Sequence, residues 1–340
     1  MNTEKKIAIV NSSTFGKHYP DLRKRLEALG PIESFQFPPE VPGEELTAKL
    51  KGFSFIVASV TPQFPRVLFE QNDELLLLAR HGIGVNNVDL EAATEAGVIV
   101  TRVPAAPERD AVAELSLALI MACLRDIVPG ANASKQLEWE QRSGFVGWEL
   151  SHLTVGVIGY GNIGSRVGEI IKEGFKTEVL ACDPNIADAV LAKTGVEPVE
   201  LHELLRRSDL ISLNASFKPG NYHMIGEKEI GLMKDGVIIV NTARGELTDE
   251  VALAKAVKDG KIARLGVDVL EREPILENHP FLDLQNVIVL PHLGGYTDRS
   301  LHRMDEKNVE DIEQVMRGQV PDEIANPDVL IRGTRASVSL

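Results

Sequence analysis

The sequence contains few cysteines. Its 340 residues include only Cys123 and Cys182, and the two do not form a C-x-x-C motif. This usage is not that of a disulfide-stabilised secreted protein, and it is typical of free thiols in a reducing cytoplasm. We therefore expect two buried free cysteines and a cytoplasmic location.

The sequence also lacks an excess of positive charge and any long apolar run. The 50 Asp and Glu residues outnumber the 36 Lys and Arg residues, so the formal net charge is −14. Such a charge argues against a nucleic acid or an anionic membrane surface as partner. No apolar run approaches the ~18 residues of a membrane span, and polar residues 1–6 do not resemble a signal peptide. We expect neither nucleic acid nor membrane as a partner.

The chain shows a repeated alternation of short β-forming runs and helical stretches. Its length suits two domains, and 44% hydrophobic residues is typical of a globular protein. The alternation predicts α/β architecture with doubly wound parallel sheets. Strands are expected at 7–10, 54–58, 74–78, 98–100, 155–158, 178–182, 210–213, 237–241, 264–269 and 287–290. Helices are expected at 20–29, 44–51, 89–96, 109–126, 162–172, 201–207, 227–233, 250–258 and 297–317.

The long helices suggest how the domains are divided. We interpret helix 109–126 as the crossing into a second domain and helix 297–317 as the return to the first. The predicted domains are residues 1–102 with 296–330, residues 103–295, and a tail at 331–340. The chain from Asn326 onward lacks periodicity, so we expect it to be loosely held. Trp139 and Trp148 lie among charged residues, which suggests a subunit interface, although they could equally pack on their own domain.

A glycine-rich turn follows the strand at 155–158. Gly159, Gly161 and Gly164 form the pattern G-x-G-x-x-G before a predicted helix. In a dinucleotide-binding turn, the first glycine permits the tight turn, the second lets the backbone approach a pyrophosphate, and the third lets the helix pack closely. The helix N-terminus offers N–H groups and partial positive charge to the phosphates. A purely structural strand–helix turn is the alternative.

An acidic residue supports the dinucleotide interpretation. The next strand ends at Asp183, at the separation of about 20 residues where the motif places a carboxylate for the ribose hydroxyls. The following residues, Pro184 and Asn185, include no Arg that would receive a 2′-phosphate. The pattern therefore favours NAD over NADP.

Three further segments each follow a predicted strand of the second half. They are residues 240–246 with Arg244, residues 266–274 with several carboxylates, and residues 290–295 with His292. An Arg, a carboxylate and a His beside a dinucleotide suit hydride transfer to a carbonyl: the His moves a proton, the carboxylate orients it, and the Arg binds a substrate carboxylate. Singly, Glu273 or Arg244 could form a surface ion pair, and His292 could cap the following helix.

A second glycine turn lies in the first half, at residues 82–84. It follows the strand at 74–78, and its glycines would expose main-chain N–H groups suited to a carboxylate. A simple strand–helix turn is the alternative. The neighbouring His81 is an acid–base candidate, but a lone His beside a glycine turn is more often structural.

With these segments in view, the chain resembles the D-isomer-specific 2-hydroxyacid dehydrogenase family from about Ile56 to about Glu310. The matching segments are HGIGVNNVDL at 81–90, GYGNIG with Asp183, NTARGEL at 241–247, and VDVLEREP to PHLGG at 267–295. The resemblance implies two Rossmann-like domains with an active-site cleft between them, NAD as cofactor, and a homodimer built around the cofactor domain. Phosphoglycerate dehydrogenases look most similar among its members.

The resemblance also implies roles for individual residues. Arg244 would bind the 2-keto acid, Glu273 would pair with the acid–base His292, and Asp268 would face the nicotinamide carboxamide. The implied cofactor contacts are Gly159, Gly161, Asn162, Ile163, Gly164, Asp183, Thr242, Ala243, Asp268 and His292. The implied substrate contacts are Ile83, Gly84 and Arg244. No metal ion is expected.

The substrate itself is left open. Ser59 stands where phosphoglycerate dehydrogenases often carry an Arg that meets the phosphate, and the segment PAAPER at 104–109 replaces the usual loop. A small 2-hydroxy or 2-keto acid is expected, with a 3-phosphoglycerate-like compound among the candidates. The alternatives are a non-catalytic, NAD(H)-sensing module like the corepressors of this fold family, and formate or phosphite oxidation on the same scaffold.

Overall fold

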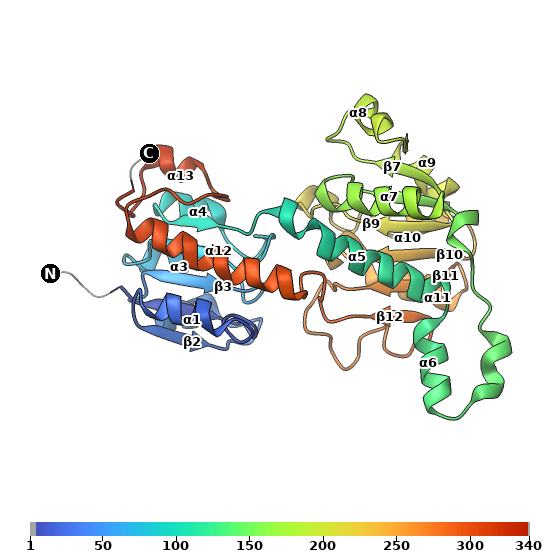
Figure 1. Ribbon diagram of the computed structural model, residues 1–340, viewed down its shortest axis with the longest axis horizontal. Helices are drawn as coiled ribbons and strands as arrows, with labels where there is room; N and C mark the ends of the chain where they lie inside the picture. The colour runs from blue at the N-terminus through green and yellow to red at the C-terminus, as the bar shows by residue number, and fades with distance from the viewer. Residues whose placement is uncertain (1–4, 339–340) are drawn as a thin grey trace. The chain divides into compact units, whose positions relative to one another are not determined.

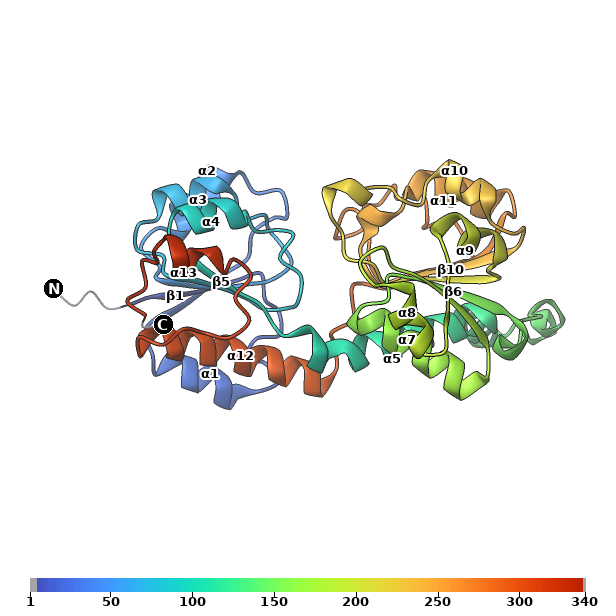
Figure 2. The same cartoon turned by 90° about the horizontal axis from the view of Figure 1, so that it is seen from above.

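The predicted alternation of strands and helices forms two parallel β-sheets, each covered by helices on both faces (Figure 1, Figure 2). The structure is a computed structural model and describes residues 5–338. The first unit consists of the described residues up to Pro107 and from Tyr296 onward, and the second is Glu108–Gly295. The boundary lies after Pro107 rather than after residue 102 as expected, because the first residues of the crossing helix α5 (Ala105–Leu124) belong to the first unit.

The first unit contains a five-stranded parallel sheet in the order β2-β1-β3-β4-β5. Its strands are β1 (Ile7–Val10), β2 (Ile32–Phe35), β3 (Phe55–Ala58), β4 (Leu77–Arg80) and β5 (Ile99–Thr101). Its helices are α1 (Pro20–Glu27), α2 (Gly43–Leu50), α3 (Arg66–Gln71), α4 (Leu90–Glu95), α12 (Asp298–Met316) and α13 (Asp328–Arg332). Strands β1, β3, β4 and β5 are buried along their whole length, which explains their nearly continuous apolar sequences.

Helices cover both faces of this sheet. Figure 2 shows α2, α3 and α4 on one face and α1 and α12 on the other. Each face has its own hydrophobic core: Leu50 and Phe69 belong to the core under α2 and α3, and Leu26 and Ile312 belong to the core under α1 and α12. Strand β2 and helix α3 were not predicted. The edge strand β2 shows no alternation of apolar and polar residues, and its central residues Glu33 and Ser34 are both exposed.

Strand β4 begins three residues later than expected and ends two residues later. The expected range was 74–78, whereas the strand spans Leu77–Arg80. The four leucines at 75–78 are equally suited to a strand throughout, so the sequence contains no mark of where pairing begins. Pairing with β3 sets the register, with Leu77 opposite Phe55 and Arg80 opposite Ala58.

The prediction of a loosely held C-terminal tail is wrong for the described residues up to 338. Val329 of α13 and Ala336 are buried in the first unit. The buried side chain of Asn326 accepts a hydrogen bond from the Val100 N–H (2.9 Å) and donates to the Val98 carbonyl (3.0 Å). Individual polar side chains attach this segment, so it lacks the apolar periodicity by which sequence analysis finds an ordered element. Residues 339–340 lie outside the described residues.

The second unit contains a seven-stranded parallel sheet in the order β12-β11-β10-β9-β6-β7-β8. Its strands are β6 (Thr154–Ile158), β7 (Glu178–Cys182), β8 (Glu197–Pro198), β9 (Leu210–Leu213), β10 (Val237–Asn241), β11 (Ile262–Val267) and β12 (Val287–Val289). Its helices include α5, α6 (Ile127–Lys135), α7 (Asn162–Phe175), α8 (Asp188–Lys193), α9 (Leu201–Arg207), α10 (Glu227–Leu232) and α11 (Glu250–Lys258). Short 3₁₀ helices are η1 (Trp139–Gly144), η2 (Leu150–His152), η3 (Pro219–Asn221) and η4 (Gly245–Leu247). None of the helices in the described part of the chain is long and apolar enough to cross a membrane.

The strand order of the second unit creates a site at one edge of its sheet. The chain proceeds from β6 outward to β7 and β8, then returns to β9 on the other side of β6 and continues outward to β12. Ligands of such sheets bind beyond the carboxyl ends of the strands, at this reversal. All the strand pairs are parallel, so the segments that follow β6, β10, β11 and β12 emerge at the same edge. The glycine turn and the three candidate catalytic segments therefore share one side of the sheet.

Both cysteines are free thiols. Burial raises the pKa of Cys123 to about 12, and it raises the pKa of the partly buried Cys182 to about 11. Because the thiolate is the reactive form, both residues are poor nucleophiles at neutral pH. The cysteines therefore have a packing role.

The attachment of the C-terminal segment can be tested at Asn326. We expect Asn326→Ala to lower the free energy of unfolding of the first unit by roughly 1–3 kcal/mol, because buried N–H and carbonyl groups of residues 98–100 lose their partner. Differential scanning calorimetry measures this effect. As a control on the same segment, Ile331→Ala alters a side chain that is 85% exposed and should change little. Equal stability of the two variants would contradict the attachment.

Candidate active site

The glycine turn after β6 places each glycine under a different constraint. Gly159 has φ of 82°, and a Cβ atom there would lie 2.5 Å from the backbone N of Ala215. A Cβ atom on Gly164 would lie 1.9 Å from the Gly159 carbonyl oxygen. In contrast, a Cβ atom on Gly161 would have nothing within 4 Å. The fold thus requires glycine at two positions, and the bare backbone at Gly161 leaves room for a ligand.

The surroundings of this turn fit a dinucleotide. Helix α7 begins at Asn162, directly after Gly161, and no side chain caps its N-terminus, so the N–H groups of its first turn are available to an anion. The Asp183 carboxylate follows β7 and accepts the Tyr160 N–H (2.8 Å) and the Asn185 N–H (2.9 Å). The Asp183 carboxylate is therefore hydrogen-bonded to the glycine turn, at the place where the motif puts a carboxylate for ribose hydroxyls.

The turn that carries Arg244 is held by a buried asparagine. Asn241 ends β10; its Oδ1 accepts the Ala243 N–H (3.0 Å) and its Nδ2 donates to the Arg244 carbonyl (2.8 Å). The Thr242 hydroxyl lies 2.6 Å from the Ser116 hydroxyl of α5. Sequence analysis did not assign Asn241 a role, although an Asn at the end of a strand and before a turn is a signal for such side-chain bonding.

Arg244 is partly buried beside acidic groups. Its guanidinium donates a hydrogen bond to the Ala243 carbonyl (2.6 Å). Burial lowers the pKa of Arg244, and the carboxylates of Glu246 and Glu273 oppose that shift. An arginine in this setting stays charged. Its partly desolvated cation is therefore suited to an anionic ligand such as a carboxylate.

Glu273 and His292 form a direct pair. The His292 Nδ1 lies 2.8 Å from the Glu273 Oε2, and the Glu273 Oε1 accepts the Leu270 N–H (3.0 Å). Both side chains are partly exposed. None of the described residues hydrogen-bonds the other ring nitrogen of His292, Nε2. The carboxylate at Nδ1 fixes the orientation of the ring and leaves Nε2 to exchange a proton with a ligand.

The backbone of His292 is in the left-handed region, with φ of 56°. This conformation costs about 1–2 kcal/mol in a residue other than glycine, and such strain is concentrated at functional sites. Asp268 holds it: its carbonyl accepts the His292 N–H (2.8 Å), and its carboxylate accepts the N–H groups of Leu293 (2.7 Å) and Gly294 (2.8 Å). Asp268 thus fixes the turn that presents the imidazole.

Asp268 is itself deeply buried. Burial raises its pKa, while the two N–H donors and the nearby His292 oppose that shift. Its predicted contact with the nicotinamide carboxamide stays a prediction. The role that the structure does show, support of the His292 turn, was not foreseen, because backbone hydrogen bonds across two loops leave no sequence pattern.

The three predicted catalytic residues come together in the second unit. The Arg244 turn packs against the loop that carries Glu273, since a Cβ atom on Gly245 would lie 2.0 Å from the Glu271 backbone N. Glu273 pairs with His292 rather than with a surface cation. His292 does not cap the following helix, because the Thr297 side chain caps α12 by accepting the Ser300 N–H.

The predicted substrate contacts Ile83 and Gly84 lie in the first unit, in the loop after β4, and both are partly buried. The neighbouring His81 is buried; its Nε2 lies 2.8 Å from the Asp305 Oδ1, and the other Asp305 oxygen accepts the Gly16 N–H. This pairing favours the structural interpretation of His81. The substrate contacts of Ile83 and Gly84 stay predictions.

The chain is similar to known dehydrogenases and reductases. The family model described as D-isomer specific 2-hydroxyacid dehydrogenase, NAD binding domain, matches residues 117–294. The chain is 38% identical to a D-3-phosphoglycerate dehydrogenase of Methanocaldococcus jannaschii over 91% of its own length, but it spans only 58% of that relative. It is 34% identical to a glyoxylate reductase of Thermococcus litoralis over 90% of this chain and 94% of the relative.

The fold matches a solved enzyme as well. The crystal structure of D-lactate dehydrogenase from Aquifex aeolicus, complexed with NAD and lactic acid, superposes with a TM-score of 0.81 at 30% identity. The match covers 98% of this chain and all of that chain. Both units therefore have the architecture of that enzyme.

The glycine turn yields a prediction that separates binding from folding. Gly161→Ala should leave the thermal midpoint unchanged and raise the NADH dissociation constant at least ~10-fold, equivalent to 1.4 kcal/mol, because the new methyl group fills the open space beside the turn. Gly164→Ala should instead lower the thermal midpoint, because its Cβ overlaps the Gly159 carbonyl. Calorimetry and NADH fluorescence measure the two effects.

Gly174→Ala is the matched control for this pair. Gly174 lies in the same helix, and a Cβ atom there would meet nothing within 4 Å. Gly174→Ala should neither lower the thermal midpoint nor raise the NADH dissociation constant, since alanine is a better helix former than glycine. Unaltered NADH binding by Gly161→Ala would show that the dinucleotide does not approach this turn.

Proposed function

Because the chain belongs to the D-isomer-specific 2-hydroxyacid dehydrogenase family, we propose that it is an NAD-dependent oxidoreductase that interconverts a small D-2-hydroxy acid and its 2-keto acid. The observation that supports this activity most strongly is the Glu273–His292 pair, 2.8 Å apart and on the same sheet edge as Arg244 and the glycine turn. Relatives that are named dehydrogenases and reductases favour an enzyme over a dinucleotide sensor.

The proposed cofactor site uses the residues of the second unit. Gly159, Gly161, Asn162, Ile163 and Gly164 form the phosphate-binding turn, and Asp183 serves the ribose hydroxyls. Thr242, Ala243, Asp268 and His292 lie at the ends of the neighbouring strands, on the nicotinamide side. When bound, the reduced cofactor supplies the hydride that reduces the C2 carbonyl.

The chain's own residues supply binding and proton transfer. Arg244 binds the substrate carboxylate through its guanidinium. In the reduction, the His292 Nε2 donates a proton to the developing C2 alkoxide, and in the oxidation it accepts the hydroxyl proton. Glu273 stabilises the imidazolium and fixes its orientation through Nδ1.

A small unphosphorylated 2-keto acid is the substrate that we propose first. Ser59 follows β3, and it offers no positive charge where phosphoglycerate dehydrogenases often carry a phosphate-binding Arg. The relative that is named glyoxylate reductase matches almost its whole length. A 3-phosphoglycerate-like substrate is the second candidate, and the 38% identity to a D-3-phosphoglycerate dehydrogenase supports it.

A substrate panel tests this proposal. Initial rates of NADH oxidation with glyoxylate, hydroxypyruvate, phosphohydroxypyruvate and a branched 2-keto acid should show turnover, with an unphosphorylated acid preferred. His292→Ala should lower kcat by roughly 10²–10⁴-fold, because proton donation is lost, while NADH affinity stays nearly unchanged. Preference for phosphohydroxypyruvate would select the second candidate. Tight NADH binding without any turnover would contradict the enzyme and favour an NAD(H)-sensing protein.

We also propose that the chain forms a homodimer through the second unit, by the segment from α6 through η1. In this segment and just after it, Leu137, Trp139 and Val146 are 88%, 68% and 73% exposed. Figure 1 shows the segment extending away from the sheet of its unit. Trp148 behaves differently, since it packs on the core of its own unit and lies under the Arg264 guanidinium. Large exposed apolar side chains in one segment are typical of an interaction site.

Sedimentation equilibrium tests the dimer. The wild-type chain should sediment at twice its mass of 37.2 kDa, and the double variant Leu137→Asp with Trp139→Asp should sediment as a monomer, because two charges would be buried at the interface. Ile331→Asp, on an equally exposed side chain of the first unit, should stay dimeric. A monomeric wild-type protein would refute this interface.

A further inference from the structure

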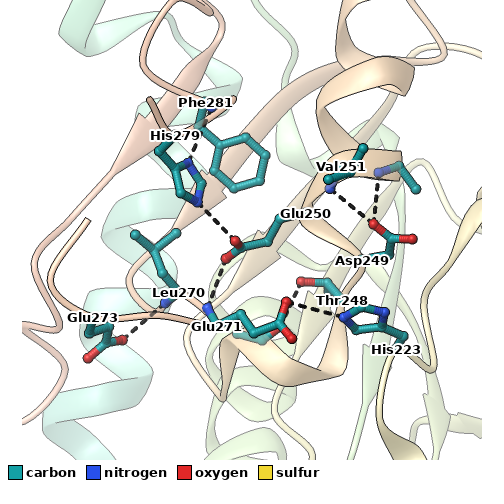
Figure 3. Close-up of polar contacts among 12 residues, drawn as sticks. His223, Thr248, Asp249, Glu250, Val251, Leu270, Glu271, Glu273, His279 and Phe281 are labelled. Atoms are coloured by element: carbon teal, nitrogen blue, oxygen red, sulfur yellow. Dashed lines mark hydrogen bonds and ion pairs between the residues drawn. The ribbon is translucent and has the colours of Figure 1, made fainter. Parts of the chain in front are cut away.

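One carboxylate outside the candidate active site holds the loop that carries Glu273. Glu250 is the first residue of α11, and its Oε1 accepts the Glu271 N–H (2.9 Å) while its Oε2 lies 2.9 Å from the His279 Nε2 (Figure 3). Glu271 lies before Glu273 in the chain and His279 lies after it. Glu250 therefore connects the two flanks of the loop between β11 and β12.

The Glu250–His279 contact is protected from solvent and has a defined hydrogen-bonding direction. The two side chains are only 12% and 8% exposed. The His279 Nδ1 accepts the Phe281 N–H (3.3 Å), so the ring hydrogen lies on Nε2 and is donated to Glu250. The Phe281 ring contacts the His279 ring edge-to-face and is buried in the core. The loop is thus anchored to the hydrophobic core through this histidine.

Glu271 is held on its other sides as well. Its carboxylate accepts a hydrogen bond from the Tyr222 hydroxyl and lies 3.3 Å from the His223 Nε2. Its backbone N lies against Gly245, where a side chain would have no room. The Leu270–Glu271 peptide is therefore wedged between the Arg244 turn and Glu250. The Leu270 N–H, on the adjoining peptide, donates to the Glu273 Oε1, and the Glu273 Oε2 faces His292.

We propose that Glu250 and His279 are positioning residues for Glu273. They fix the backbone turn in which one Glu273 oxygen is occupied by the Leu270 N–H and the other faces the His292 Nδ1. The consequence for catalysis rests on the proposed function. Without the Glu250–His279 contact, Glu273 would leave the imidazole for part of the time, and protonated His292 would lose its main stabilising partner.

The charged groups around His292 determine the direction of the effect. The Glu273 carboxylate contacts the His292 Nδ1, and the Asp268 carboxylate accepts a backbone N–H of the turn that follows His292. The Arg244 guanidinium interacts electrostatically with Glu273. Reduction requires the protonated imidazole, which Glu273 favours. Displacement of Glu273 should therefore move the falling limb of the kcat profile for reduction to lower pH.

Hydrogen–deuterium exchange of the apoprotein provides a test that requires no substrate. In His279→Ala, the Leu270 and Glu271 amides should exchange at least ~10-fold faster than in wild type, because their acceptors are no longer held in place. His279→Gln should retain slow exchange, since its side-chain N–H can donate to Glu250. His152→Ala, which removes an exposed histidine paired with Glu149 in the same unit, is the control and should have no effect. Unchanged exchange in His279→Ala would overturn the proposal.

Kinetics distinguish positioning from general support of the fold. His279→Ala should lower kcat for reduction at neutral pH by roughly 10-fold, shift the pH profile to lower pH, and leave KM for NADH nearly unchanged. In a Glu273→Gln background, which removes the carboxylate charge, His279→Ala should add no further shift. If His279→Ala lowers kcat equally in the wild-type and Glu273→Gln backgrounds and leaves the pH profile of kcat unchanged, the proposal is overturned.

A second variant covers the case in which His279→Ala does not fold. Glu250→Gln keeps the side-chain size but places an amide N–H opposite the His279 N–H, and it should produce the same faster exchange and the same pH shift. If Glu250→Gln leaves both unchanged, the proposal is refuted. A wild-type protein without turnover would refute the proposed function alone, because the exchange measurement still tests the two positioning residues.

Discussion

The candidate active site depends on the hydrogen bond between Glu273 and His292, which joins two loops that leave neighbouring strands. Neither partner is placed by its own loop alone. The His292 backbone adopts a left-handed conformation that costs about 1–2 kcal/mol, and three hydrogen bonds to Asp268, worth roughly 0.5–1.5 kcal/mol each, can offset that cost. On the other side, Leu270 holds one oxygen of Glu273. The pair thus meets at 2.8 Å because its surroundings restrict both residues.

Sheet topology explains why residues far apart in the chain meet at this edge. Parallel pairing sends each chain segment out at the same end of the sheet, so Arg244, Glu273 and His292 follow β10, β11 and β12 in turn. The reversal between β6 and β9 opens the same edge for the glycine turn. Buried Asn241 and buried Asp268 then orient the segments, since both satisfy backbone groups that would otherwise be unpaired in a low-dielectric interior.

Much of the second unit could be predicted from the sequence because its strands are buried and its helices amphipathic. The ranges of β9, β10, α9 and α11 agree with expectation. The short edge strands β2 and β8 lack that pattern, so periodicity does not reveal them. Strand β4 begins within a run of leucines, so periodicity does not show its first residue. The C-terminal attachment through Asn326 and the bonds made by Asp268 are single polar contacts without a repeating pattern. The same holds for Glu250 and His279, whose meeting depends on the path of a long loop.

The proposed reaction is reduction of a 2-keto acid at C2 by NADH-dependent hydride transfer, with His292 as proton donor. The most direct measurement follows deuterium from stereospecifically labelled [4-²H]NADH into the product of the best 2-keto acid that yields a chiral hydroxy acid. We expect deuterium at C2 of the D-enantiomer, from only one of the two labelled forms of NADH. Deuterium at C2 of the L-enantiomer, or product without deuterium from either form, would contradict it.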